Sequence, residues 1–207
     1  MSDKHKIVVG VGGASGAVYA KVLFDKLHAL SNQIEAVGVV MSDNAKDVWK
    51  YELGNEDYAK YPFRFYGKDD FMAPFASGSA RYGTMIICPC SMGTLARIAT
   101  GISNDLMTRA ADVVLKERRR LVLLVRESPL HLGHLRTMTA LTEMGAIISP
   151  PLPAFYAKPA SIAEMVDQSV GRALDLFDLD WSAVRRVGQR PQGLVLTLVV
   201  NWLIKPF

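Results

Sequence analysis

The sequence predicts an α/β fold of three layers, with a central parallel sheet of the Rossmann or flavodoxin-like kind between two layers of helices. Two observations support this. Short apolar runs of strand length alternate with segments of helical periodicity along most of the chain. The first run, Ile7–Val11, leads through the glycine-rich turn Gly12–Gly16 into a helical pattern. Strands joined through helices pair in parallel by right-handed crossovers, so we expect helices on both faces of the sheet.

The first half of the chain alternates clearly. A helix to about Leu30 follows the first strand, and the second strand, Ile34–Met41, is followed by a helix that Ser42 caps. The stretch 54–81 is rich in glycine and proline, which predicts a loop with a short strand near Phe63–Tyr66. A third strong strand, Met85–Cys88, then turns into a helix that ends near residue 99.

The second half continues the pattern. We expect a helix over about 105–117, the strand Leu121–Val125, a helix that starts at Ser128-Pro129 and stops at 145, and a strand at 146–148. Prolines between 150 and 159 predict an extended segment. A capping box at Ser161 opens the last helix, whose apolar stripe runs from Ile162 to Phe177. We expect one domain over 1–181 and a tail, 182–207, that packs on the domain or on a neighbouring subunit.

Composition narrows the class of function. The formal charge of +4, from 24 basic and 20 acidic residues, favours a small anionic ligand over nucleic acid. The chain has two cysteines, Cys88 and Cys90, a pattern typical of a reducing compartment, so we expect a cytoplasmic protein. No apolar run reaches the roughly 20 residues of a membrane span. His131 and His134 form the one close histidine pair, for which a capping or packing role is favoured over metal binding.

Arg126-Glu127 closes the most apolar strand of the chain. In open parallel sheets, ligands bind beyond the carboxyl ends of the strands, where an Arg can hold an anion and a Glu can move a proton. A structural ion pair with a neighbouring helix explains the two charges equally well. The pair is therefore a candidate site with an open alternative.

The turn Gly12–Gly16 leaves room for a ligand, and the helix after it offers unpaired amides to a phosphate. It lacks the dinucleotide spacing and the P-loop lysine, so the turn is compatible with a nucleotide or flavin phosphate or simply with tight helix packing. Arg109 and Lys116 are seven residues apart and share a helix face with Asp112, for which a surface ladder is the favoured interpretation. Lys116 is nevertheless joined to Arg126-Glu127 by a short connection that could place all three charges around one crevice.

Six segments together resemble the UbiX flavin prenyltransferase family in order and spacing, from about Lys6 to Trp181. They are Gly13-Ala-Ser-Gly-Ala17, Pro89-Cys-Ser91, Arg109-Ala-Ala-Asp-Val-Val-Leu-Lys116-Glu-Arg-Arg, Val125-Arg-Glu127, His131-Leu-Gly-His134 and Pro153-Ala-Phe-Tyr156. The resemblance implies a flavodoxin-like Rossmann domain that binds FMN, without a metal. It implies transfer of a dimethylallyl group from a prenyl phosphate to N5 of reduced FMN, followed by ring closure onto C6. The product, prenylated FMN, serves UbiD-type decarboxylases.

The same resemblance implies roles for individual residues. The expected FMN-binding positions are Gly13, Ala14, Ser15, Ser42, Ser91, Met92, Gly93, Thr94 and Arg126. The expected positions around the dimethylallyl phosphate are Lys116, Glu127, Tyr156 and Arg172, with Glu52 and Arg109 as further members of the polar site.

Physical reasoning supports these roles. A prenyl monophosphate becomes an electrophile when cations offset the charge of its departing phosphate. Lys116 and Arg172 are suited to that task, and Tyr156 can donate a hydrogen bond. We expect Glu127 to transfer protons, with Lys116, Ser15 and Glu52 in the same catalytic group, and Trp49 and Phe155 to form apolar walls. The family also implies a large homo-oligomer, expected to be a dodecamer, with sites at subunit boundaries.

Three other functions compete. A flavin-dependent cysteine decarboxylase of the same fold class would need a histidine in the first half, but none lies between His28 and His131. An FMN carrier, or the small subunit of an aromatic-acid decarboxylase, would need the flavin turns without the phosphate-binding group. An NAD-dependent oxidoreductase would have an acidic residue at the end of the second strand, where Asp43 is displaced by Ser42.

Overall fold

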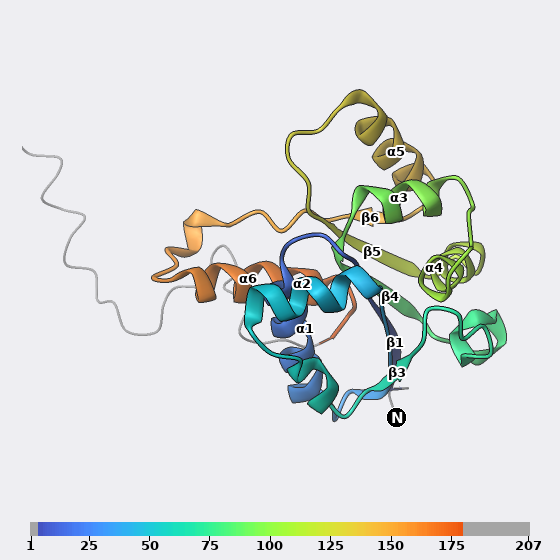
Figure 1. Ribbon diagram of the computed structural model, residues 1–207, viewed down its shortest axis with the longest axis horizontal. Helices are drawn as coiled ribbons and strands as arrows, with labels where there is room; N and C mark the ends of the chain where they lie inside the picture. The colour runs from blue at the N-terminus through green and yellow to red at the C-terminus, as the bar shows by residue number, and fades with distance from the viewer. Residues whose placement is uncertain (1–3, 180–207) are drawn as a thin grey trace, which may run out of the picture.

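A computed structural model describes residues 4–179 as a single parallel sheet between two layers of helices (Figure 1). The expected tail over 182–207 lies outside the described residues. The six strands are β1 (His5–Val11), β2 (Ile34–Met41), β3 (Arg64–Tyr66), β4 (Thr84–Cys90), β5 (Arg120–Val125) and β6 (Ile147–Ile148). Every pairing between neighbours is parallel, as predicted.

The strand order is β3-β2-β1-β4-β5-β6, which is the Rossmann order. Without the three-residue strand β3, the remaining five strands follow the flavodoxin order, so both descriptions of the fold apply. The order reverses between β1 and β4, whose connections leave on opposite sides. This switch point is where open α/β sheets bind ligands.

Six helices cover the sheet: α1 (Ala17–Ala29), α2 (Asp43–Leu53), α3 (Met92–Ala99), α4 (Leu106–Lys116), α5 (Leu132–Glu143) and α6 (Ile162–Asp175). The buried residues of α1, α2 and α6 form one hydrophobic cluster, and those of α3, α4 and α5 form a second. Successive strand residues alternate between the two clusters, as in Ile86 and Ile87 of β4. The sheet is therefore buried on both faces, which explains the continuous apolar runs in the sequence.

The segment 54–81, expected to be mostly loop, contains β3 and the short 3₁₀ helices η1 (Asp57–Lys60), η2 (Pro74–Ala76) and η3 (Gly78–Ala80). Its backbone accepts hydrogen bonds from α4 and the turn after it, through Arg109 to Ala76 and Arg119 to Gly78. Buried Phe75 fills the space above Gly38, where a Cβ would come 2.5 Å from the Phe75 ring. This segment therefore supports one flank of α4.

Three details of the sequence prediction were wrong. Helix α5 begins at Leu132 rather than at Ser128-Pro129, because His131 caps it by accepting the Gly133 N–H on Nδ1 at 3.0 Å. Ile162, placed on the buried stripe of α6, is 78% exposed because it opens the helix before the helix packs on α1. Glu164 accepts the N–H of Ala160 rather than that of the cap residue, so the capping box at Ser161 is only half formed.

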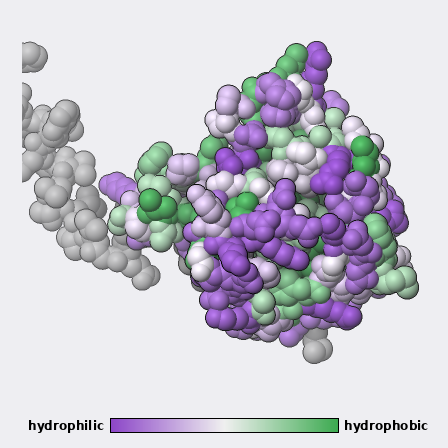
Figure 2. Space-filling view, in the orientation of Figure 1, coloured by the Kyte–Doolittle hydropathy of each residue, from purple (hydrophilic) through white to green (hydrophobic). Residues whose placement is uncertain are grey.

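Segment 149–161 connects β6 to α6 and projects from the body of the protein (Figure 1). It carries exposed Leu152, Phe155 and Tyr156, and a 3₁₀ turn η4 (Phe155–Ala157) near its tip. Hydrophobic surface gathers on the same projection in Figure 2. We call this segment the arm.

Phe24 is the centre of an aromatic cluster under α1, with four ring neighbours at 5.1–6.1 Å between centroids. Because Phe24 is fully buried, Phe24→Ala should lower the free energy of unfolding by about 3–5 kcal/mol. Tyr51→Ala, at a position 91% exposed, should change it by less than about 0.5 kcal/mol. Urea unfolding of both variants measures this, and equal stabilities would contradict the described core.

Candidate functional site

The turns after β1, β2, β4 and β5 meet at the carboxyl edge of the sheet, tied together by hydrogen bonds. The N–H of Gly12 donates to the Pro89 carbonyl at 3.0 Å, and the N–H of Ser42 donates to the Val11 carbonyl at 3.1 Å. Arg126 donates its backbone N–H to Cys90 at 3.1 Å and its Nε–H to the Ser15 carbonyl at 2.9 Å. The segments expected to bind flavin are therefore neighbours, although they are distant in sequence.

Glycine is required where these turns approach each other most closely. A Cβ on Gly12 would lie 2.7 Å from the Pro89 carbonyl oxygen, and one on Gly13 would lie 2.6 Å from the Asn44 Cβ. Both distances are shorter than real Cβ contacts, so a larger residue would push the turns apart. The glycines after β1 therefore allow the turn to pack closely against Pro89 and the start of α2. Close packing was one of the two interpretations of this turn from the sequence. It also brings together the turns that are expected to bind flavin.

Glu52 reaches back from the last turn of α2 to the start of α1. Its carboxylate accepts the N–H groups of Gly16, at 3.0 Å, and Ala17, at 2.7 Å. Two orphan amides of α1 are thus already satisfied by an anion. Glu52 therefore lies beside the Ser15 turn, and it occupies the place at which a phosphate would otherwise bind α1.

The start of α3 presents a second set of donors. Ser91 caps the helix by accepting the Thr94 N–H at 3.3 Å, and the two hydroxyls lie 3.1 Å apart. The N–H groups of Met92 and Gly93 precede the first intrahelical bonds and have no partner within α3. Gly93 is exposed, and a Cβ there would meet nothing within 4 Å, so a ligand has room to approach. Met92 is available through its backbone alone, because its side chain is buried in the core.

The group expected around the prenyl phosphate is not assembled in one copy of the chain. Lys116 ends α4, just before the amino end of β5, whereas Glu127 follows the carboxyl end of that strand. Six strand residues span about 20 Å, so the prediction that the connection places Lys116 near Arg126-Glu127 was wrong within one copy. Instead, Lys116 Nζ lies 2.6 Å from Glu117 Oε1.

The other members of that group are exposed or have partners outside the group. Tyr156 is 63% exposed on the arm, and Arg172 faces Asp175 at 3.6 Å on α6. Arg109 donates to Ala76 and pairs with Asp112 at 3.1 Å, so half of the surface ladder weighed from the sequence is present. Glu127 is exposed and accepts the N–H of Ser128 at 2.9 Å. Within residues 4–179, no hydrogen bond or ion pair joins these side chains to one another.

Two further expectations are corrected or refined. Trp49 does not form a wall of the site, because it is fully buried against Phe24 and Tyr58. Asp43 accepts a hydrogen bond from Lys68 at 2.5 Å, and this contact lowers the pKa of Asp43. Asp43 is thus engaged by a cation rather than extended toward the ribose of an NAD cofactor, which weakens the oxidoreductase interpretation.

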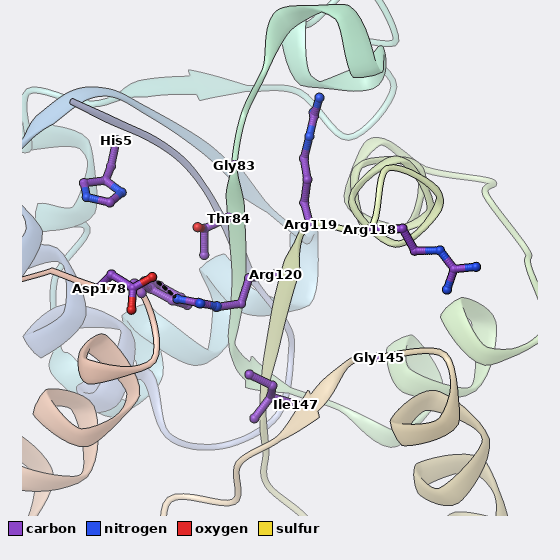
Figure 3. Close-up of a pocket in the computed structure, with 10 residues that line it drawn as sticks. His5, Gly83, Thr84, Arg118, Arg119, Arg120, Gly145, Ile147 and Asp178 are labelled. Atoms are coloured by element: carbon purple, nitrogen blue, oxygen red, sulfur yellow. Dashed lines mark hydrogen bonds and ion pairs between the residues drawn. The ribbon is translucent and has the colours of Figure 1, made fainter. Parts of the chain in front are cut away.

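A cavity of about 500 Å³ lies at the opposite edge of the sheet, at the amino ends of the strands (Figure 3). Three consecutive arginines line it, but they point in different directions, and Arg120 is paired with Asp178 at 2.7 Å. Arg119 donates to the carbonyls of Tyr82 and Gly78. Since the cations do not converge, this cavity lacks the arrangement expected of a phosphate site. Within residues 4–179, no cluster of three His, Cys, Asp or Glu side chains is arranged to hold a metal ion, and no helix could cross a membrane.

Comparison with known proteins agrees with the family resemblance seen in the sequence. The family model named Flavoprotein matches residues 1–174. The flavin prenyltransferase UbiX of Thauera aromatica is 47% identical over 180 residues, which cover 84% of this chain and 90% of that protein. The UbiX of Escherichia coli K12 is 44% identical over 83% of this chain and 91% of its own length.

The chain belongs to the UbiX flavin prenyltransferase family of flavoproteins.

Solved structures of the UbiX family agree in three dimensions. The crystal structure of AnUbiX (PadA1), in complex with FMN and dimethylallyl pyrophosphate, matches 91% of this chain and all of that chain with a TM-score of 0.83 and 45% identity. A dodecameric FMN-dependent UbiX-like decarboxylase from Escherichia coli O157:H7 matches 87% of this chain and 98% of its own, with a TM-score of 0.83 and 42% identity. The cysteine decarboxylase SpaF, at 17% identity and a TM-score of 0.58, shares the fold alone.

The two cysteines lie beside the ligand turn but are chemically protected. Both are free and fully buried, and burial raises the pKa of Cys90 to about 12 and also raises that of Cys88. Because the thiolate is the reactive form, neither thiol should be alkylated by iodoacetamide in the folded protein at pH 8. Mass spectrometry should show no adduct in buffer and two adducts in guanidinium. Rapid labelling of either cysteine in buffer would contradict the described burial.

Proposed function

We propose that this protein transfers a dimethylallyl group from dimethylallyl monophosphate to reduced FMN, and that the prenylated FMN it makes is used by a UbiD-type decarboxylase. One observation carries the proposal. Arg126, Ser15, Glu52 and the start of α3 converge on the carboxyl edge of the sheet, at its switch point, in a chain 47% identical to a flavin prenyltransferase. The donors there are amides, hydroxyls and a guanidinium, which suit a phosphate and the carbonyl oxygens of a flavin.

The flavin phosphate belongs at the start of α3 rather than at α1 in this proposal. Glu52 already accepts the first amides of α1, and a second anion there would repel it. At α3 the N–H groups of Met92 and Gly93 and the hydroxyls of Ser91 and Thr94 face no such competitor. Arg126, fixed on the Ser15 carbonyl, and Ser42, at the start of α2, then border the ring system together with Gly13 and Ala14.

Reduced FMN supplies the nucleophilic N5, and C6, where the new ring closes. The protein must hold the prenyl phosphate against the flavin and neutralise the phosphate as it leaves. We assign that neutralisation to Lys116, Arg109 and Arg172, with a hydrogen bond from Tyr156. Glu127 carries the proton to the departing phosphate, and Glu52 and Ser15 lie on the flavin side of the reaction.

Because Lys116 and Glu127 lie about 20 Å apart in one copy, the proposal requires more than one copy of the chain at each site. The arm, which follows the carboxyl end of β6, supports this because it exposes Leu152, Phe155 and Tyr156 to solvent. A homologue of known structure is dodecameric. We therefore propose a homo-oligomer, expected to be a dodecamer, with sites at subunit boundaries. The domain over 1–181 forms the site, and the free buried thiols are consistent with a cytoplasmic location.

Incubation of the purified protein with reduced FMN and dimethylallyl monophosphate, followed by mass spectrometry of the extracted flavin, tests the activity. A gain of one prenyl unit is expected. Unmodified FMN in a protein that binds it tightly would favour the FMN carrier, or the small subunit of an aromatic-acid decarboxylase, over the prenyltransferase.

The role of Glu127 has its own test. Glu127→Gln removes the proton-transfer group but keeps a hydrogen-bonding side chain of the same size, so kcat should fall by about 10²-fold or more. Titration with FMN should show unchanged binding. Full turnover in this variant would refute the role assigned to Glu127.

Sharing of the site between copies can be tested by complementation. Lys116→Ala and Glu127→Gln should each be inactive alone. When the two variants are coexpressed in one oligomer, random mixing should leave about a quarter of the shared sites with both native residues. Recovery of about that fraction of activity is expected. No recovery, in mixed oligomers shown to contain both chains, would mean that the two residues act within one copy.

A further inference from the structure

Arg97, in α3, is not one of the expected site residues, yet it hydrogen-bonds to two of them and to the start of α4. Its guanidinium donates from NH1 to Asp105 Oδ2 at 2.6 Å and to Asn104 Oδ1 at 3.1 Å. It also donates from NH2 to the Thr94 hydroxyl at 3.4 Å and from Nε to the Gly93 carbonyl at 3.4 Å. The side chains of Arg97 and Asp105 are 34% and 21% exposed, so the pair is partly shielded from water.

Asp105 is itself held in one position. Its Oδ1 caps α4 by accepting the N–H and the hydroxyl of Thr108, at 2.8 and 2.9 Å, which leaves Oδ2 for Arg97. The starts of α3 and α4 are therefore clamped together through one guanidinium. Because Asp105 holds the Arg97 guanidinium in place, the groups that Arg97 bonds in α3 are also fixed in position.

The group that Arg97 positions is the Thr94 hydroxyl. Thr94 Oγ1 accepts from Arg97, and Ser91 Oγ accepts the Thr94 N–H, so both hydroxyl protons remain to be donated. The contact between the two oxygens, at 3.1 Å, uses one of these protons. One hydroxyl proton is then left without a partner among the described residues, at the same helix start as the amides of Met92 and Gly93.

We propose that Arg97, held by Asp105, is a positioning residue that keeps the Ser91–Thr94 turn in a donor state and so selects phosphorylated flavin over riboflavin. The inference rests on the proposed function, because it requires that the turn at α3 receives the FMN phosphate. Arg97 acts through Thr94, not by touching the ligand. Its charge is balanced by Asp105, so the phosphate is bound by neutral donors of fixed direction.

Flavin binding by Arg97→Met separates this role from a purely structural one. Methionine keeps an apolar side chain of similar length but lacks the guanidinium that bonds Asp105 and Thr94. The Kd for FMN should therefore rise about tenfold, while the Kd for riboflavin stays within about twofold. Arg136→Met, at an exposed arginine of α5 that makes none of these bonds, is the control and should leave both values unchanged. An equal loss for both flavins, or no loss, would overturn the inference.

Asp105→Asn distinguishes positioning from direct contact. Asparagine remains a good N-cap for α4 but gives up the ion pair with Arg97. If Arg97 acts by position, FMN binding should weaken, and the double variant should bind FMN no more weakly than Arg97→Met alone. Tighter FMN binding in Asp105→Asn would mean that the released guanidinium contacts the phosphate directly, and additive losses would mean that the pair is not one unit. Either result would overturn the inference.

Two safeguards keep the test interpretable. If Arg97→Met does not fold, Arg97→Lys serves in its place. A lysine ammonium can pair with Asp105, but it lacks the second guanidinium nitrogen that bonds Thr94. It should then show the same FMN-selective loss. Failure of the wild-type protein to bind FMN would refute the proposed function, whereas normal wild-type binding with no selectivity change in the variants would refute only the role of Arg97.

Discussion

The hydrogen bond between Gly12 and Pro89 joins the two turns on which the rest of the site depends. Strands β1 and β4 are paired as far as Gly10 and Ile87, and beyond that point their chains leave toward opposite faces of the sheet. Without the contact at 3.0 Å, the turns after these strands would be free to separate. The close approach is possible because Gly12 has no Cβ, which would otherwise lie 2.7 Å from the Pro89 oxygen. Arg126 and Glu52 then attach β5 and α2 to the same turn.

The structure divides the expected chemistry into two parts. The donors proposed to bind the flavin come from neighbouring strand ends of one sheet, within one copy of the chain. The residues proposed to bind the prenyl phosphate are dispersed, with Lys116 toward the amino edge and Tyr156 on the projecting arm. Under the proposed function, the chain therefore binds FMN through its own fold and needs assembly for catalysis. The need for assembly also links activity to protein concentration, because a site shared between copies exists only in the oligomer.

Much of the fold could be predicted from the sequence, because strands buried on both faces and amphipathic helices carry strong periodic signals. The helix cap at Ser42 was predicted from residue type and is confirmed, whereas the caps at Ser91 and Asp105 were not predicted. The start of α5 was predicted wrongly, since a histidine cap is unusual and Ser-Pro imitates a helix start. Trp49 was misjudged because an aromatic residue near a candidate site does not reveal whether it faces the site or the core.

The residues of the candidate site were proposed from resemblance, because spacing alone did not join them. Lys116 and Glu127 are close in sequence, but a strand lies between them, so proximity along the chain becomes separation in space. The role of Arg97 had no sequence signal, because its partner Asp105 lies eight residues away across a helix break. Such contacts depend on the angle between two helices, which local patterns do not specify.

The most direct measurement is a crystal structure of the protein with bound FMN. We expect the flavin phosphate within hydrogen-bonding distance of the Ser91 and Thr94 hydroxyls and the Gly93 N–H, with the ring system beside Ser15 and Arg126. A flavin phosphate bound instead at the amino edge of the sheet, among Arg118, Arg119 and Arg120, would contradict this expectation.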